Sequence, residues 1–321
     1  MKMVSRDGLR LVAVAALVLL TFSCQDGTVA PGEVPQPQFA QQASSSNAEF
    51  LAAIMDNVNA ALEAQGAEYR VAMAEYITGA GGEEGNTVLS KVVGNKQLTF
   101  DFVPFDPRRV TWSGSVAGPD DDITYAVDMT GDAVPPLGGL GQPTTDAAID
   151  RAMATWDGEQ CSTLPITQNP DFGLDLGFTA FFFINGQGGP AMVADVQHAG
   201  WTDINFPGGI LGATFTLVFF PITDIDNNGK GDVAFREIYY DPSFSWADDG
   251  VSSIDVETVA LHEAGHGLSQ AHFGKVFLKN DLSVKASPRA VMNAFYLGPQ
   301  RTLLGTDNGG HCSNWAQWPN N

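Results

Sequence analysis

The stretch HEAGHGLSQAH, residues 262–272, brings three histidines and one glutamate into a single short segment. Upstream of it, apolar residues recur at helical spacing: Val256, Val259 and Ala260. Ser252 and Asp255 have the spacing of a helix capping box just before this run. The periodicity therefore predicts a helix that carries at least the first part of the motif.

The spacing of the motif suits a metal ion. At about 100° per residue, His262 and His266 point about 40° apart around a helix, and Glu263 lies on the same side. Two imidazoles on one face can hold one metal ion while a carboxylate beside them acts as a general base. A catalytic zinc takes three protein ligands and keeps one open position, and His272 can serve as the third ligand. Three of the five histidines of the chain thus fall into one arrangement.

Other readings of these residues stay open. Some zinc proteases use a downstream glutamate as the third ligand, but no glutamate follows Glu263 in the chain. Asp281 and Asp307 are the carboxylates that could bind the metal in place of His272. The simplest explanation is two surface histidines on an ordinary helix, but this does not account for the third histidine.

The extended motif resembles that of the metzincin metallopeptidases, and most closely of their matrixin branch, over roughly residues 120–321. The stretch SPRAVM, residues 287–292, is similar to the matrixin Met-turn, which implies that Met292 lies beneath the metal. Ile123–Val127 resembles the first strand of the family, and Gly208–Phe215 resembles the sheet segment that borders its cleft.

The resemblance implies an α+β zincin-like fold, with a twisted mixed sheet, an active-site helix and a C-terminal helix. Ala294 stands where other metzincin branches carry a metal-binding tyrosine, which favours the matrixin branch. Ser269 stands where the family has a glycine, whose left-handed backbone leads the chain from the helix to the third ligand. Serine can adopt this conformation at a cost of about 1 kcal/mol, and the departure removes no ligand and no catalytic group.

A zinc ion bound by His262, His266 and His272 implies a zinc-dependent endopeptidase, which hydrolyses peptide bonds by means of a zinc-bound water with Glu263 as general base. Cleavage within a chain follows from the resemblance alone, and the expected partner is a protein or peptide substrate. The alternative is a non-catalytic, calcium-dependent surface binding protein on a zincin fold, which Ser269 and an acidic loop favour. The presence of Glu263 opposes it, because a structural zinc site needs no base.

That acidic loop, DIDNNGKGD at residues 224–232, matches the start of an EF-hand calcium loop. Its oxygen-bearing side chains stand at loop positions 1, 3, 5 and 9: Asp224, Asp226, Asn228 and Asp232. Position 12 is Phe235, so the bidentate glutamate of a full site is missing. We therefore expect a reduced calcium site suited to extracellular calcium, with an acidic Asn-Gly turn between two strands as the simpler interpretation.

The start of the chain predicts export. It is basic, with Lys2, Arg6 and Arg10. The apolar run Leu11–Phe22 has the length of a signal-peptide core and is too short to span a bilayer, so we expect a signal peptide over residues 1–23. Cys24, at the end of LLTFSC, resembles the lipidated cysteine of bacterial lipoproteins, with ordinary cleavage nearby as the alternative. The expected location is extracytoplasmic, as a bacterial cell-surface lipoprotein or a secreted protein.

The net charge limits the classes of binding partner, and the cysteine content indicates a possible disulfide. The 321 residues include 37 acidic and 16 basic side chains, which gives a net charge of −21. This charge excludes nucleic acid and an anionic membrane surface as electrostatic partners, so a membrane contact is expected only through a lipid at Cys24. Apart from Cys24, the chain has one pair of cysteines, Cys161 and Cys312, which are candidates for a disulfide in an oxidising compartment.

The pattern along the chain predicts three parts after the signal peptide. Residues 24–47 are rich in Gln, Pro, Ser and Ala and are expected to form a flexible tether. Residues 48–118 predict a small helix-plus-strands unit, either an accessory unit or a prosegment that would bring Asp101 or Asp106 to the metal. Residues 119–321 are expected to form the catalytic domain, with a helix at 145–157 and strands at 123–129, 177–184, 191–196, 210–220 and 233–240.

Overall fold

The computed structural model describes most of the chain after residue 46. The described ranges are 47–79, 82–93, 99–109, 122–129, 140–183, 188–202, 206–252, 254–279 and 283–320. The signal peptide, Cys24 and residues 24–46 of the expected tether lie outside the described residues, and Asn47 already begins a helix.

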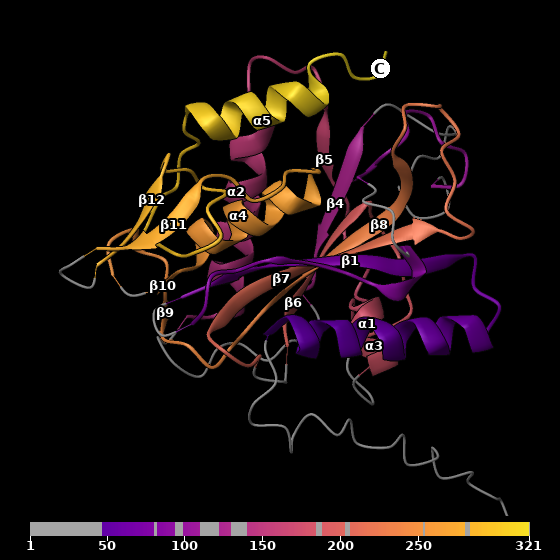
Figure 1. Cartoon of the computed structure of the whole chain (residues 1–321), viewed down its shortest axis with the longest axis horizontal. Helices are drawn as coiled ribbons and strands as arrows, with labels where there is room; N and C mark the ends of the chain where they lie inside the picture. The colour runs from indigo at the N-terminus through magenta and orange to yellow at the C-terminus, as the bar shows by residue number, and fades with distance from the viewer. Residues whose placement is uncertain are drawn as a thin grey trace, which may run out of the picture. The chain divides into compact units, whose positions relative to one another are not determined.

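A mixed sheet forms the centre of the fold (Figure 1). Its strands are β1 (Tyr69–Thr78), β2 (Thr87–Leu89), β3 (Phe100–Asp101), β4 (Ile123–Val127), β5 (Ile166–Gln168), β6 (Val196–Trp201), β7 (Ile210–Phe219) and β8 (Gly231–Tyr240). The strand order is β2-β1-β7-β8-β6-β4-β5, with β3 beside β8. Strands β5, β4, β6 and β8 run parallel, whereas β7 is antiparallel to both β8 and β1. The expected mixed sheet is therefore confirmed.

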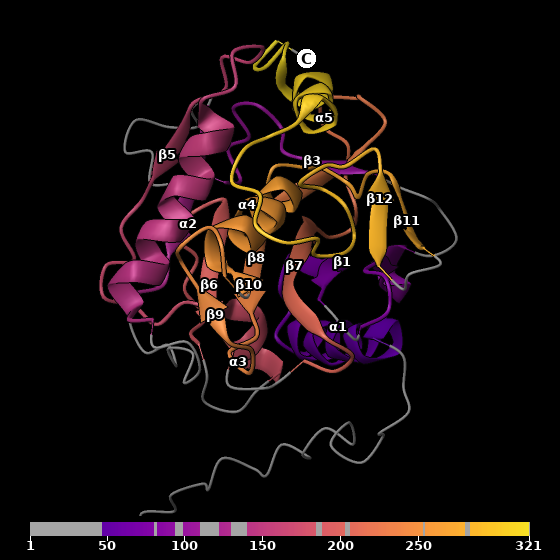
Figure 2. The same cartoon turned by 90° about the vertical axis from the view of Figure 1, so that its left-hand side faces the viewer.

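Helices cover both faces of this sheet (Figures 1 and 2). In the described residues they are α1 (Asn47–Ala64), α2 (Gln142–Asp157), α3 (Phe178–Phe183), α4 (Val256–Gly267) and α5 (Gly305–Trp315), with a short 3-10 turn, η2, at Lys91–Val93. Helices α2, α4 and α5 lie on one side, and α1 and α3 lie on the other. Two small ribbons complete the structure: β9 (Trp246–Ala247) with β10 (Ile254–Asp255), and β11 (Lys275–Leu278) with β12 (Val284–Ser287).

The two helical layers create two hydrophobic cores. One core joins α2 and α4 to the sheet through residues such as Trp156, Leu261 and Ile238. The other joins α1 and α3 to the opposite face, where Leu51 and Phe215 are buried. Because both faces are covered, every residue of β7 and of β8 is buried, polar residues included.

Two of the expected strands are wrong. Residues 178–183, FTAFFF, form α3, because the buried carboxylate of Glu237 accepts hydrogen bonds from the backbone N–H groups of Phe178 and Thr179 (2.6 and 2.7 Å) and caps the helix. The strand expected at 191–196 begins only at Val196, since the N–H of Val193 donates to the Gln197 side chain at 2.7 Å instead of to a backbone carbonyl. The other expected strands and the helix at 145–157 are confirmed within a few residues.

The segment before residue 110 is built into the same sheet as the rest of the chain. Strand β1 pairs with β7 from Tyr69 opposite Phe219 to Thr78 opposite Ile210. The boundary expected near residue 119 lies outside the described residues, and the described residues on both sides of it belong to one compact unit. Residues 47–109 therefore supply strands to the central sheet instead of forming a sheet of their own.

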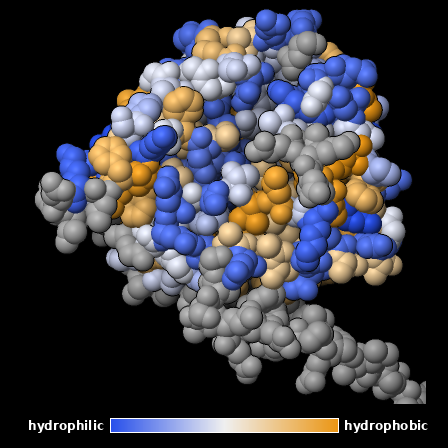
Figure 3. Space-filling view, in the orientation of Figure 1, coloured by the Kyte–Doolittle hydropathy of each residue, from blue (hydrophilic) through white to orange (hydrophobic). Residues whose placement is uncertain are grey.

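The surface carries scattered apolar residues. Figure 3 shows hydrophilic side chains over most of one face, with hydrophobic residues in small groups between them. Such a distribution is ordinary for a folded domain and marks no docking surface by itself. Within the described ranges, no helix is both long enough and apolar enough to cross a lipid bilayer.

A disulfide joins Cys161, just after α2, to Cys312 in α5, across 151 residues of chain. Closing a loop of this length restricts the unfolded chain, so replacing both cysteines by serine should lower the free energy of unfolding by about 2–5 kcal/mol. Urea unfolding of the oxidised protein measures this loss. A reductant should lower the midpoint of the wild type and leave the double variant unchanged, whereas a wild-type midpoint that ignores the reductant would contradict the prediction.

Candidate metal centre

Helix α4 presents the motif on its buried side. It begins at Val256, with Asp255 as the N-cap residue, whose carboxylate accepts from the N–H of Thr258 at 2.9 Å. The capping box expected to start at Ser252 is therefore wrong, because the helix begins three residues later. Arg301 also binds the Asp255 carboxylate, and all twelve residues of α4 are buried. The helix thus holds its histidines within a dry, fixed setting.

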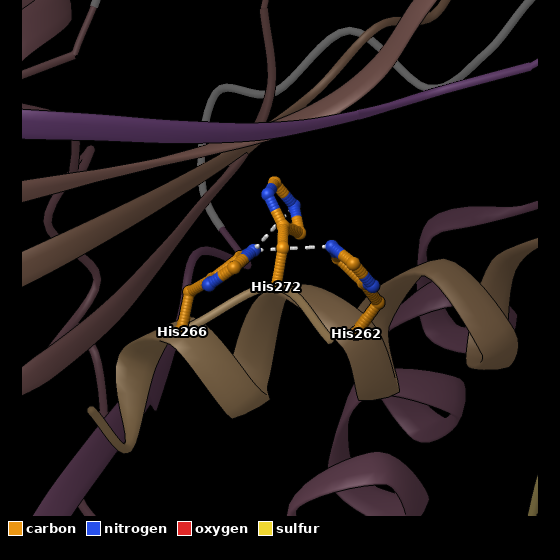
Figure 4. A group of neighbouring side chains, drawn as sticks. All are labelled: His262, His266 and His272. Carbon is orange, nitrogen blue, oxygen red and sulfur yellow. Dashed lines mark hydrogen bonds between the residues drawn. The ribbon is translucent and has the colours of Figure 1, made fainter. Parts of the chain in front are cut away.

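The three histidines of the motif converge on one point (Figure 4). The Nε2 atom of His266 lies 3.1 Å from Nε2 of His262 and 3.1 Å from Nε2 of His272. His262 and His266 project from α4, and His272 reaches them from the segment that follows the helix. The ligand set expected from the sequence is thus brought together in space.

Hydrogen bonds at Nδ1 determine the tautomer of the His262 and His266 rings. Nδ1 of His262 lies 2.7 Å from the carbonyl oxygen of Val291, and Nδ1 of His266 lies 2.8 Å from that of Gln270. A carbonyl oxygen only accepts, so each Nδ1 donates and each neutral ring directs an Nε2 lone pair toward the centre. Such pairs repel unless a cation lies between them.

The spacing of the converging nitrogens fits zinc. Ligands at about 2.0–2.1 Å in a tetrahedron lie about 3.3–3.4 Å apart, close to the 3.1 Å separations between these Nε2 atoms. A shared proton could offset the repulsion between two of the nitrogens, but it would leave the third nitrogen without a partner. Three imidazoles are also the protein donor set of some catalytic zinc sites, in which water takes the fourth position.

Burial and neighbouring charges set the protonation of the rings. Burial, followed by the facing His266, lowers the pKa of both His262 and His272 well below the usual value, which favours the neutral form that binds metals. Burial also acts on His266, but the carboxylate of Glu75 outweighs it and raises the pKa of that ring. Glu75 comes from β1 and was not expected at this site.

Glu263 lies beside the three rings with one oxygen bound and one without a partner. Its Oε2 accepts from the Thr214 hydroxyl of β7 at 2.6 Å, and among the described residues no group hydrogen-bonds to Oε1. Burial raises the pKa of Glu263 to about 7. The backbone of Gly212 approaches so closely that an added Cβ would lie 3.0 Å from Glu263 Cγ, so the side chain is held against β7.

Met292 packs directly against α4 at Gly265. An added Cβ on Gly265 would lie 2.3 Å from the Met292 sulfur, so only glycine fits between the two ligand positions of the helix. Asp307 of α5 accepts from the N–H groups of Val291 and Met292 at 3.0 and 3.1 Å. Asp307 therefore supports this turn and is not a metal ligand here, and Asp281 lies outside the described residues.

Ser269 does adopt the left-handed backbone that the family reaches with glycine. Its φ is +63°, and it directs the chain from the end of α4 toward His272. Its hydroxyl accepts from Nη1 of the buried Arg236 at 2.9 Å, and its carbonyl oxygen accepts from Asn314 of α5 at 2.8 Å. The departure from the motif thus keeps the turn and adds a hydrogen bond.

The other two histidines and the two aspartates of the prosegment interpretation lie away from the three rings. His198 is buried against Tyr240, and His311 stacks on Trp156, so both are core residues. Asp101 pairs with Lys230 and Asp106 pairs with Arg108, so neither is at the metal centre. No pattern in a single sequence singles out Glu75, Thr214 or Asp307, because each reaches the site from another element through tertiary packing.

A cavity of about 370 Å³ opens beside His272. Its walls come from the segment after β1, from the loop after α4 and from the chain after Met292: Glu84, Gly85, Asn86, Thr87, Ala271, Gly274 and Ala294. Thr78 and Gly85 also bind the chain after Met292, because Tyr296 N–H donates to Thr78 O at 2.8 Å and Gly85 N–H donates to Ala294 O at 2.7 Å. Of the three rings, His272 is the one that lines this cavity.

The acidic loop brings three of its four expected ligands together. Oxygens of Asp224, Asp226 and Asp232 lie within 4.8 Å of one another. The Asp232 carboxylate also pairs with Arg108 at 2.6 Å, which offsets part of the negative charge. Asn228 directs its amide nitrogen toward Asp226, and its amide oxygen accepts from the N–H of Lys230 at 2.8 Å.

No protein-family model matches the chain, and no curated protein matches it. The functional assignment therefore depends on the geometry of the site and on the motif.

Replacing Ser269 separates the cost of its backbone from the value of its hydroxyl. Ser269→Ala keeps the positive φ and loses the bond to Arg236, so it should destabilise the protein by about 1–3 kcal/mol. Ser269→Gly loses the same bond but relieves the backbone, so it should be about 1 kcal/mol more stable than Ser269→Ala. Urea unfolding of both variants measures the order, and an alanine variant as stable as the glycine variant would contradict it.

Proposed function

We propose that the chain is an extracytoplasmic zinc-dependent endopeptidase of the metzincin type. In this proposal His262, His266 and His272 hold the zinc, and Glu263 is the general base. The observation that carries it is the convergence of three Nε2 atoms next to a buried carboxylate with an oxygen that has no partner among the described residues. A zincin-like fold, inferred from the motif and its Met-turn, belongs to the same proposal.

The residues of the site divide the chemistry among them. Zinc, when bound, supplies a Lewis acid that polarises a peptide carbonyl and lowers the pKa of water. Glu263 accepts the proton of the attacking water at Oε1 and delivers it to the leaving nitrogen, while Thr214 holds Oε2 and fixes the carboxylate. Full burial of Glu263 keeps bulk water away from the proton transfer.

A peptide substrate reaches these groups through the cavity beside His272. The outer edge of β7, which the resemblance places along the cleft, is paired with β1 over the length of the strand. A substrate therefore has no free edge on β7 next to Glu263, and the cavity between residues 84–87 and 271–274 is the approach. Its volume suits a few residues of an extended chain, so we expect cleavage in flexible segments of proteins.

The alternative, a non-catalytic binding protein, is less well supported. Ser269 and the acidic loop favour it, but Ser269 adopts the conformation that the family's glycine provides. A structural zinc site also gives no reason to bury a carboxylate with an oxygen facing no partner among the described residues. The extracytoplasmic location and the lipid at Cys24 remain predictions from residues outside the described ranges.

Separate variants test the base and the third ligand. Glu263→Gln leaves all three histidines, so the protein should keep its zinc and lose peptide hydrolysis by about 10²–10⁴-fold. His272→Ala should lose zinc as well as hydrolysis, because two imidazoles are a poor cage. Metal content after dialysis and digestion of a mixed peptide library, followed by mass spectrometry, measure both properties.

Glu68→Gln is the matched control for the base, because Glu68 is exposed and directly precedes β1. This variant should bind zinc and hydrolyse peptides like the wild type. Wild-type hydrolysis by Glu263→Gln would remove the assignment of the base. Zinc binding by the wild type with no cleavage of any library peptide would favour the binding protein.

Calcium at the acidic loop is a second prediction. Calcium at one hundred times its dissociation constant should stabilise metal-free protein by about 2.7 kcal/mol and raise the melting temperature. Asp226→Asn should abolish this rise, whereas Asp56→Asn, an exposed carboxylate on α1, should leave it intact. A melting temperature that ignores millimolar calcium would agree with the simpler interpretation, an Asn-Gly turn whose charge Arg108 and Lys230 offset.

A further inference from the structure

Glu75 is a buried carboxylate beside the metal centre. Its side chain is 4% exposed, and Oε2 lies 3.2 Å from Nδ1 of His266. Its other oxygen, Oε1, accepts from the hydroxyl of Thr87 in β2 at 3.0 Å. A buried carboxylate is costly unless a charge or a hydrogen-bond donor compensates it, so its place beside a metal-ligating ring requires an explanation.

The sheet directs Glu75 toward α4. Strand β1 pairs with β7 so that Glu75 stands directly opposite Thr214. Side chains of directly opposed residues lie on the same face of a sheet, and Thr214 reaches from that face to Glu263. Figure 4 shows the purple strand of β1 passing over the three rings. Glu75 therefore reaches His266 from the same face of the sheet on which Thr214 binds Glu263 of α4.

We propose that Glu75 is a positioning residue of the metal centre, an inference that rests on the proposed zinc site. Its carboxylate acts through His266: it lies at the outer nitrogen, next to the hydrogen that Nδ1 donates to Gln270, and holds the ring with Nε2 toward the metal. It is not a ligand itself, because Oε2 lies beside the nitrogen that faces away from the centre.

Charge gives Glu75 a second effect. Three neutral imidazoles leave the two positive charges of a zinc ion uncompensated inside the protein. The buried carboxylate of Glu75 brings a negative charge to the same place, and Glu263 adds a second one when it is ionised. Loss of the Glu75 charge therefore weakens metal binding even when all three ligands are present.

A positioning role for Glu75 gives the segment before residue 110 a part in the metal centre. Glu75 and its partner Thr87 belong to β1 and β2. The sequence predicts that these strands belong either to an accessory unit or to a prosegment. With Glu75 supporting His266, these strands are part of the metal centre itself. A prosegment is removed without loss of the site, whereas removal of β1 would take away a support of a zinc ligand.

Zinc affinity of the full-length chain tests the proposal without relying on hydrolysis. Glu75→Gln should raise the zinc dissociation constant about 10–100-fold, as is usual when a partner of a metal-ligating histidine is lost. Glu68→Gln removes the same charge at an exposed position of the same strand region and should leave zinc affinity unchanged. Thr87→Val, at an exposed residue, removes only the hydroxyl bound to Glu75 and should weaken zinc binding a few-fold.

Cobalt substitution separates positioning from folding. The visible spectrum of the cobalt-loaded protein reports the geometry of the ligands, so it should change in Glu75→Gln and stay as in the wild type in Glu68→Gln. If Glu75→Gln has the zinc affinity and the cobalt spectrum of the wild type, the positioning role of Glu75 is overturned. The proposed function is unaffected by that result. If Glu75→Gln fails to fold, an unchanged affinity in Thr87→Val overturns it. A wild type that binds no zinc would instead overturn the proposed function.

Discussion

Three imidazole nitrogens that face one another inside a protein repel unless a cation lies between them, and the rest of this site is arranged to hold them there. Nδ1 of His262 and Nδ1 of His266 each donate to a backbone carbonyl oxygen. These bonds fix the orientation of the two rings, so their Nε2 lone pairs point toward the centre. The third ring, of His272, arrives because the chain reverses at a left-handed residue just after α4. Without a cation the three Nε2 lone pairs repel one another, and a divalent metal bound between them would remove this repulsion.

Several elements far apart in sequence hold this arrangement in place. The turn at Met292 packs against Gly265 and is held from behind by Asp307 of α5, and the disulfide at Cys312 fastens the same helix. On the opposite side, the sheet supplies the groups that face the rings. Strand β7 contributes Thr214, and β1 extends the sheet beyond β7 and contributes Glu75. The centre therefore depends on the whole sheet and not on the motif alone.

The features that could be predicted from the sequence are local ones. The proposed ligands on α4 and the third histidine follow from spacing within eleven residues, and the positive φ of Ser269 is what the resemblance implies for that position. The strand expected at 177–184 is wrong because a carboxylate from β8, Glu237, caps α3, and an aromatic run carries no sign of a distant cap. For the same reason nothing in the sequence indicates Glu75, because only the pairing of β1 with β7 decides which carboxylate faces the rings.

X-ray absorption at the zinc edge, measured on the full-length chain loaded with one zinc ion, tests the central claim most directly. We expect three imidazole nitrogens and one further light atom at about 2.0–2.1 Å, with no sulfur neighbour. The same measurement on His272→Ala should show two imidazoles. A zinc ion bound by two or fewer imidazoles in the wild type, or a chain that retains no zinc, would contradict the account.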